Sequence, residues 1–313
     1  MKREQFCYKK FSDLACQILN KDQVPLYMKK FSKKTFTTHQ LLTLLLIKSY
    51  EKKGYRAFIS FLKVSHIPSW LRLKKIPHFT TLQKFAERLQ VDQLEKLLLQ
   101  SGKVKKFERA GIDATGMTFR NPSRHYEKRV GKKIKKRDFF KTAIIADLDH
   151  QLILAAKLRK RARHDTIDFL PLWNKVKHLA FKWFYMDRGY DAEFCHNEIL
   201  DKGKISFGCL KNLSVPIHKT YGTARKAVKR HLKQKKKNWR ALIESINKAF
   251  KAICGHVVQA KKLHTQKVEM FLKLITYNLY RTITRKINFA LNWIADLISY
   301  FELCFKKKLA MTG

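Results

Sequence analysis

The hydrophobic periodicity of the chain changes near residue 105, and this change constrains the fold more than any other feature. Before it, apolar residues recur at helical spacing, and the capping-box pair Thr37 and Gln40 opens one such stretch. After it, short apolar runs typical of strands alternate with helical segments. The strand-like runs cover residues 109–115, 139–148, 151–158, 181–186 and 204–210. This order of elements predicts an α/β fold built on a mixed sheet with flanking helices.

We expect a helical domain over residues 1–104 and an α/β domain over residues 105–313 that ends in helices from about residue 239. The short helices of the first domain, joined by tight turns, suit a helix-turn-helix module that reads DNA. Its recognition helix would cover residues 80–88, opened by a second capping box of Thr80 and Gln83. Its outward-facing residues would be Gln83, Lys84, Glu87 and Arg88. A plain helical packing domain is the alternative.

Charge indicates a polyanionic partner. The chain holds 68 Lys and Arg against 24 Asp and Glu, a formal net charge of +44. Such an excess repels itself unless a polyanion is near, and DNA binding releases the counterions that phosphates condense. A generally basic proteome, or association with the ribosome, would also produce this composition.

Two runs of basic residues flank the predicted sheet strands. One covers residues 120–137 and the other residues 211–237. Runs of like charge are often merely solvated segments. Because both border the predicted chemical face, we expect them to follow the DNA backbone. The candidate contacts are Lys135, Lys136, Arg137, Arg225, Lys229, Arg230 and Lys235.

Targeting signals are missing from the sequence. The N-terminus lacks the apolar core of a signal peptide, and no apolar run is long enough to span a bilayer. The six cysteines show no zinc-binding spacing and suit buried thiols in a reducing compartment. We therefore expect a soluble, cytoplasmic protein.

Two acids follow apolar runs at predicted strand ends. Asp113 comes directly after Ile112, and Asp187 directly after Met186. Ligands of open α/β sheets gather at the carboxyl ends of strands, and Mg²⁺ prefers oxygen ligands. Two metal ions held by such acids can activate an attacking water or hydroxyl and stabilise a leaving oxygen. Each acid could instead cap a turn or pair with one of the many lysines.

A third acid lies on a predicted helix. Arg240, Glu244 and Lys251 fall within roughly 40° of one another around a helix with about 100° per residue. Glu244 can therefore point at the metals, while Arg240 and Lys251 orient carboxylates or contact a phosphate. An ordinary solvent-facing stripe is the alternative. The sequence contains no P-loop, no dinucleotide-binding glycine motif and no nucleophile elbow.

The chain resembles DDE-type transposases of prokaryotic insertion sequences over about residues 37–285. The resemblance rests on residues 111–116, 164–165 and 186–191, together with the spacing of Arg240, Glu244 and Lys251. In the family's Tyr-x2-Arg-x3-Glu-x6-Lys signature, the tyrosine position is Lys237 here.

The resemblance implies a ribonuclease-H-like core in which Asp113, Asp187 and Glu244 bind two Mg²⁺ or Mn²⁺ ions, supported by Arg188, Arg240 and Lys251. It also implies nicking at transposon ends, attack of the 3′-OH on target DNA, and action as a dimer or larger synaptic complex at the nucleoid. Some relatives carry a large β-rich insertion before the catalytic Glu. We expect none here, because only about thirty residues, in a stretch rich in basic side chains, separate the last predicted strand from the helix of Glu244.

Three other functions are compatible with the sequence. A domesticated or decayed transposase would bind DNA without cutting it. A structure-specific nuclease on the same core would cleave branched DNA without joining ends. A structural RNA-binding protein would need no group of three carboxylates.

Overall fold

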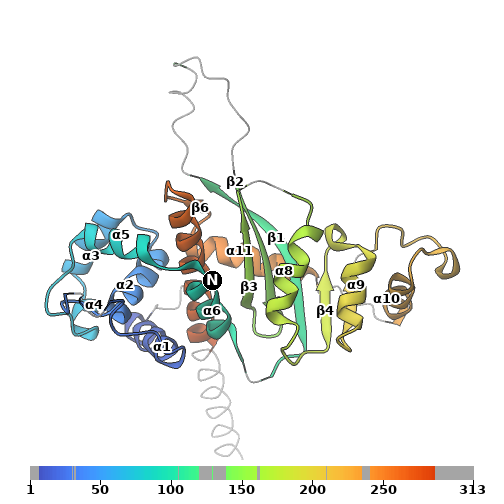
Figure 1. Cartoon of the computed structure of the whole chain (residues 1–313), viewed down its shortest axis with the longest axis horizontal. Helices are drawn as coiled ribbons and strands as arrows, with labels where there is room; N and C mark the ends of the chain where they lie inside the picture. Colours follow the sequence, from blue (N-terminus) through green and yellow to red (C-terminus); the bar gives the residue numbers. More distant parts are fainter. Residues whose placement is uncertain are drawn as a thin grey trace, which may run out of the picture.

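The computed structural model describes residues 7–29, 31, 33–104, 106–119, 129, 139–160, 163–208, 210–234 and 240–285. Its helices pack at one side of a central sheet and over both sheet faces (Figure 1). The predicted fold class is confirmed: helices come first, a mixed α/β sheet follows, and helices close the described chain.

Six helices, α1 to α6, precede the sheet and are called the N-terminal helices below. They are α1 (Tyr8–Lys21), α2 (Thr38–Glu51), α3 (Tyr55–Lys63), α4 (Ile67–Trp70), α5 (Phe79–Arg88) and α6 (Val91–Gly102). The capping box of Thr37 and Gln40 at the start of α2 is confirmed, with both reciprocal hydrogen bonds present. The box predicted at Thr80 and Gln83 is wrong. Helix α5 begins one residue earlier, so Thr80 lies inside it and its hydroxyl pairs with His78 Nδ1 at 2.8 Å.

The sheet has six strands. They are β1 (Arg109–Phe119), β2 (Phe139–Asp147), β3 (Leu152–Arg159), β4 (Trp183–Met186), β5 (Ile205–Gly208) and the short β6 (Val257–Val258). The order is β3-β2-β1-β4-β5, and β6 also pairs with β1. Strands β1, β2 and β3 are antiparallel, whereas β4, β5 and β6 run parallel to their neighbours. All five long predicted strands are present.

Both faces of the sheet are covered, which explains why β2 reads as an almost continuous apolar run. On one face, α8 (Thr166–Val176) and α9 (Glu193–Leu200) pack on residues such as Ile112 and Ile145. On the other face, α11 (Arg240–Cys254) packs on residues such as Ile144. Figure 1 shows α8 in front of the strands and α11 behind them. Successive side chains of each strand therefore point into two separate hydrophobic cores.

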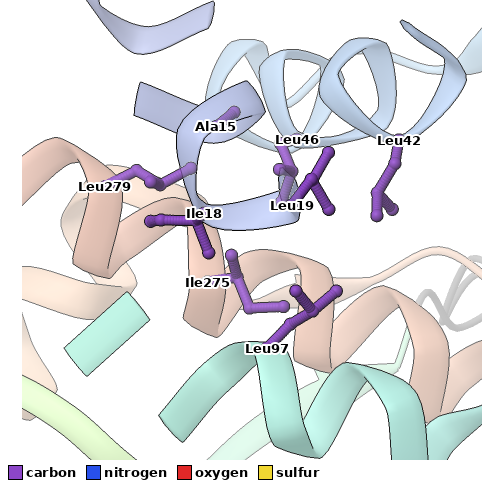
Figure 2. Close-up of a pocket in the computed structure, with 8 residues that line it drawn as sticks. All are labelled: Ala15, Ile18, Leu19, Leu42, Leu46, Leu97, Ile275 and Leu279. Carbon is purple, nitrogen blue, oxygen red and sulfur yellow. The ribbon is translucent and has the colours of Figure 1, made fainter. Parts of the chain in front are cut away.

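One of these cores joins the N-terminal helices to the sheet. Figure 2 shows α1, α2, α6 and the helical residues 263–285 meeting at one place. The cavity between them has a volume of about 10 Å³ and is lined only by apolar side chains. The lining residues are Ala15, Ile18, Leu19, Leu42, Leu46, Leu97, Ile275 and Leu279. This core continues into β1, β2 and α11. Side chains of the N-terminal helices and of the α/β part thus pack against one another in one hydrophobic core.

Two elements differ from the predicted pattern. The segment from residue 239 was expected to be wholly helical, but β6 interrupts it by pairing with the end of β1. Between β5 and α11, described residues 210–234 form η2 (Ile217–Lys219) and α10 (Thr223–Gln234), with no strand. None of the helices in the described part of the chain combines the length and apolar character that crossing a bilayer requires.

Candidate active site

Asp113 and Asp187 lie side by side because of strand register. Ile112 on β1 pairs with Met186 on the parallel strand β4. Asp113 and Asp187 are the next residues along the chain. Asp187 lies just beyond the end of β4, as predicted, but the strand end predicted at Asp113 is wrong, because β1 continues to Phe119 and Asp113 pairs with Ile144 of β2. Neighbouring strands are about 4.8 Å apart, so the register brings the two backbones together at the carboxyl end of β4.

The environment of Asp113 places all three predicted acids within electrostatic reach. Its carboxylate accepts hydrogen bonds from Ala114 N and Asn247 Nδ2, both at 2.8 Å. Burial raises the pKa of Asp113; these two hydrogen bonds lower it, and the charges of Asp187 and Glu244 raise it again. The net pKa is above its usual value. A cation would relieve this crowding of negative charge.

Helix α11 is fixed against β1 at several points. Ile243 of α11 packs next to Gly111 of β1, where an added Cβ would lie 3.4 Å from Ile243 Cδ1. Asn247 reaches Asp113 one turn further along the helix. Beyond the end of α11, the carbonyl of His256 accepts a hydrogen bond from Thr118 N at 2.9 Å as β6 joins β1. These contacts hold α11, which carries Glu244, against the part of β1 that carries Asp113.

The turn after β4 explains why Asp187, Gly189 and Tyr190 occur in the segment 187–191. Asp187 Oδ1 accepts from Arg188 N at 2.6 Å and caps the short helix η1 (Arg188–Tyr190). Gly189 is needed because a Cβ would collide with the carboxylate of Asp165. Tyr190 is 1% exposed and packs into the core under α8. The sequence motif is therefore a set of packing constraints that orient Asp187.

A buried ionic network supports that turn. Lys141 of β2 is 5% exposed, and its Nζ lies 2.7 Å from Asp165 and 3.2 Å from Asp168. Asp168 also pairs with Arg159 of β3. The network joins β2, β3 and α8 directly behind η1. Of its members, sequence reasoning singled out only Asp165.

Sequence reasoning also missed Asn247. It is 6% exposed, and its amide donates to Asp113, while its Oδ1 has no hydrogen-bond partner among the described residues. A buried acceptor without such a partner is costly, so this oxygen is available to a bound group at the site. The available signal was its position three residues after Glu244, on the same helical face.

The donor set of the three acids fits a hard divalent ion. Asp113, Asp187 and Glu244 offer only carboxylate oxygens, which suit Mg²⁺ or Mn²⁺. Within the described residues, no group of three or more His, Cys, Asp or Glu side chains is arranged to hold a metal. Asp187 and Glu244 thus act electrostatically on Asp113, although the three carboxylates do not form a ready-made metal-binding group.

The predicted supporting residues fall in different places. Arg188 is exposed beside Asp187. Lys251 lies two turns beyond Glu244 and lines a separate basic pocket. The side chain of Arg240 lies outside the described part of the structure, although its backbone begins α11.

The predicted DNA-contacting residues also divide. On α5, Gln83, Lys84 and Arg88 are exposed, and on α10 Arg230 is exposed. Residues Lys135, Lys136, Arg137 and Lys235 lie outside the described residues.

Two other candidates on α10 are used inside the protein. Arg225 donates through Nε to Asp191 Oδ1 at 2.9 Å. Lys229 is 4% exposed and donates to the carbonyls of Asn212 and Val215. We therefore revise the role predicted for Lys229: its ammonium closes the loop before α10 instead of facing the surface.

A family of known proteins matches the part of the chain that holds these acids. The family described as "Transposase DDE domain" matches residues 108–279, a range that contains all three acids. A piggyBac transposase, solved as a synaptic complex with hairpin DNA, is similar at 7% identity and a TM-score of 0.45. That comparison covers 90% of this chain and 75% of the other. No curated protein matches the chain.

Proposed function

Since the chain belongs to the transposase DDE domain family, we propose that it cleaves DNA at transposon ends and joins the freed 3′-OH to target DNA. One observation supports this above others. Asp113 and Asp187 follow paired residues of adjacent parallel strands, and α11 brings Glu244 close enough to raise the pKa of Asp113. Three acids in such proximity, in a chain with a formal net charge of +44, suit metal-dependent chemistry on DNA.

We assign roles to the residues as follows. Asp113, Asp187 and Glu244 would hold two Mg²⁺ or Mn²⁺ ions. When bound, such ions stabilise negative charge on the phosphate undergoing attack. Asn247 keeps the Asp113 carboxylate oriented. Arg188 and Arg240 would contact the scissile phosphate or the carboxylates.

DNA would be held by the exposed basic residues. We propose that α5 contacts the transposon end through Gln83, Lys84 and Arg88, and that Arg230 and the basic residues 135–137 and Lys235 follow the backbone. We retain the boundary between residues 104 and 105, the ribonuclease-H-like assignment of the sheet, and a dimeric or larger synaptic complex as parts of this proposal.

Replacement of one acid tests the mechanism. Glu244→Gln keeps the size of the side chain but removes its charge, so we expect cleavage to fall about 10³-fold or more. DNA affinity in EDTA should stay within about twofold, since the change adds no repulsion to DNA. The assay measures Mg²⁺- or Mn²⁺-dependent nicking of a supercoiled plasmid and joining of a labelled 3′-OH end.

Glu198→Gln on α9 is the matched control and should cleave as wild type does. Loss of DNA binding together with cleavage in Glu244→Gln would contradict the metal-binding role. Cleavage without any end joining would favour a structure-specific nuclease, and binding with no metal-dependent cleavage in wild type would favour an inactive DNA-binding descendant.

The DNA around the gene tests the transposon assignment without purified protein. Short inverted repeats bounded by a direct duplication are expected there if the chain mobilises its own element, such as a prokaryotic insertion sequence. Their absence would favour the domesticated or nuclease alternatives.

A further inference from the structure

A basic pocket of about 360 Å³ lies where α2 meets the end of α11 and β6. Five lysines and one histidine line it: Lys48, Lys52, Lys53, Lys251, Lys273 and His256. Glu269 is the one acid among the described lining residues. The walls come from both the N-terminal helices and the α/β part, so the pocket lies on the seam between them.

The lysines of the pocket exceed the carboxylates that neutralise them. Lys273 lies 3.7 Å from Glu269, and Lys53 pairs with Glu51. By contrast, Lys52 donates to the carbonyl of Ala252 at 2.6 Å. That partner is neutral, as is the ring of Tyr55 that Lys48 covers at 4.3 Å from its centroid.

Helix ends offset only part of this charge. Helices α2 and α11 both end here, and a helix C-terminus carries about half a negative charge. Burial lowers the pKa of Lys48 and of Lys273, while the charge of Glu269 acts to raise both. The charge of Lys273 lowers the pKa of Lys48 further. The pocket therefore concentrates positive charge that an anion would stabilise.

We propose that this pocket binds a backbone phosphate of DNA, so that α2 contributes Lys48 and Lys52 to the DNA path beside the three acids. The proposal rests on the proposed function, because it assumes that DNA runs along α11. Lys251 is seven residues beyond Glu244, which corresponds to about 10 Å at 1.5 Å per residue. This spans about three nucleotides of one strand at 3.4 Å each.

The geometry gives the pocket a second consequence. Because its walls belong to α2, α11 and β6, a bound phosphate would tie the N-terminal helices to the helix that carries Glu244. DNA would thus stiffen the seam between them as it enters the site.

The test measures DNA binding in EDTA, where no metal-dependent cleavage occurs, so its result does not depend on catalysis. A fluorescent duplex is titrated with wild type and with a Lys48→Gln/Lys52→Gln variant at several salt concentrations. We expect affinity to fall about tenfold, and the slope of log Kd against log salt to drop by about 0.9 for the lost phosphate contact.

The control pair is Lys182→Gln/Lys202→Gln. These exposed lysines precede β4 and β5, so they lie at the N-terminal ends of the parallel strands, whereas Asp187 follows the C-terminal end of β4. Their replacement removes the same amount of charge. An equal fall in DNA affinity for both variants would mean that the effect comes only from the loss of net positive charge, and this would overturn the proposal.

Two further measurements separate the ligand source and guard against misfolding. Inorganic phosphate that raises the Tm of wild type but not of the variant, with DNA affinity unchanged, would show a free-anion site and overturn the DNA assignment. Acetylation footprinting of wild type needs no variant: DNA should protect Lys48 and Lys52. Unchanged labelling of both lysines would mean that they only neutralise helix ends.

Discussion

At the scale of single residues, the site depends on side chains that orient the acids as much as on the acids themselves. Asn247 donates to Asp113, and Gly189 makes room for Asp165 behind the turn that carries Asp187. Such supporting contacts fix a carboxylate before any ligand arrives, and their loss weakens metal sites.

Asn247→Ala tests this idea. Removal of the amide frees one oxygen of Asp113 and lets its carboxylate turn away, so we expect activity to fall about 10- to 100-fold. The metal concentration for half-maximal cleavage should rise, while DNA affinity in EDTA stays the same. Ser245→Ala, an exposed position on the same helix, is the control. Unchanged metal dependence with reduced activity would argue against a positioning role.

At the scale of elements, the two aspartates could be found because the sequence shows where apolar runs stop, although only Asp187 follows the end of its strand and Asp113 lies inside β1. Asp113 and Asp187 follow such runs, and the parallel pairing of β1 with β4 then brings them together. The face of α11 that carries Glu244 was likewise readable from helical spacing. Side-chain partners across the fold were not readable, since the contact of Asn247 with Asp113 spans 134 residues.

Other features escaped prediction for different physical reasons. Strand β6 has two residues, too few to show an alternating pattern. The burial of Lys229 depends on backbone carbonyls of the loop before α10, which no residue pattern encodes.

Helix α10 is attached to α9 by a buried polar cluster. Asp191 accepts from Arg225 and from Lys211 N, and Glu193 accepts from Ala224 N at the start of α10. His196 is fully buried, with Nε2 3.2 Å from Asp191 Oδ1 and Nδ1 2.9 Å from Ser206 Oγ. Because a carboxylate only accepts, the neutral ring carries its proton on Nε2.

This cluster predicts a pH dependence of stability. Burial lowers the pKa of His196, although Asp191 acts to raise it. The folded state then binds fewer protons than the unfolded state below about pH 6.5, so the free energy of unfolding falls as pH decreases. The limiting slope from one histidine is about 1.4 kcal/mol per pH unit.

The measurement compares urea unfolding of wild type and His196→Gln between pH 7.5 and pH 5. The wild-type protein alone is not sufficient, because the raised pKa values of Asp113 and Asp147 make the free energy of unfolding rise as pH decreases, opposite to the effect of His196. These two aspartates are present in both proteins, so the difference between the proteins isolates His196. Wild type should lose more stability on acidification than His196→Gln. If the free energies of unfolding of the two proteins changed with pH in parallel, His196 would be protonated equally in the folded and unfolded states.

At the scale of the whole molecule, the N-terminal helices and the sheet share one core. Beyond the apolar contacts of Figure 2, Asn278 links the two parts by hydrogen bonds. Its side chain is fully buried, donates to Ser101 Oγ and Ile153 O, and accepts from Ile153 N. Gly102 allows this approach, since a Cβ there would lie 2.5 Å from the carbonyl of Ile153.

Asn278→Ala should therefore destabilise both parts together. Loss of the amide leaves the N–H and carbonyl of Ile153 without those bonds in a buried place, at a cost of about 3 kcal/mol. Hydrogen exchange followed by mass spectrometry should show equal loss of protection in α2 and β2, since one core unfolds as one unit. Asn197→Ala, exposed on α9, should change neither element. Loss of protection in α2 alone would instead mean that residues 1–104 unfold independently, and the DNA-contacting helices could then move without disturbing the carboxylates on the sheet.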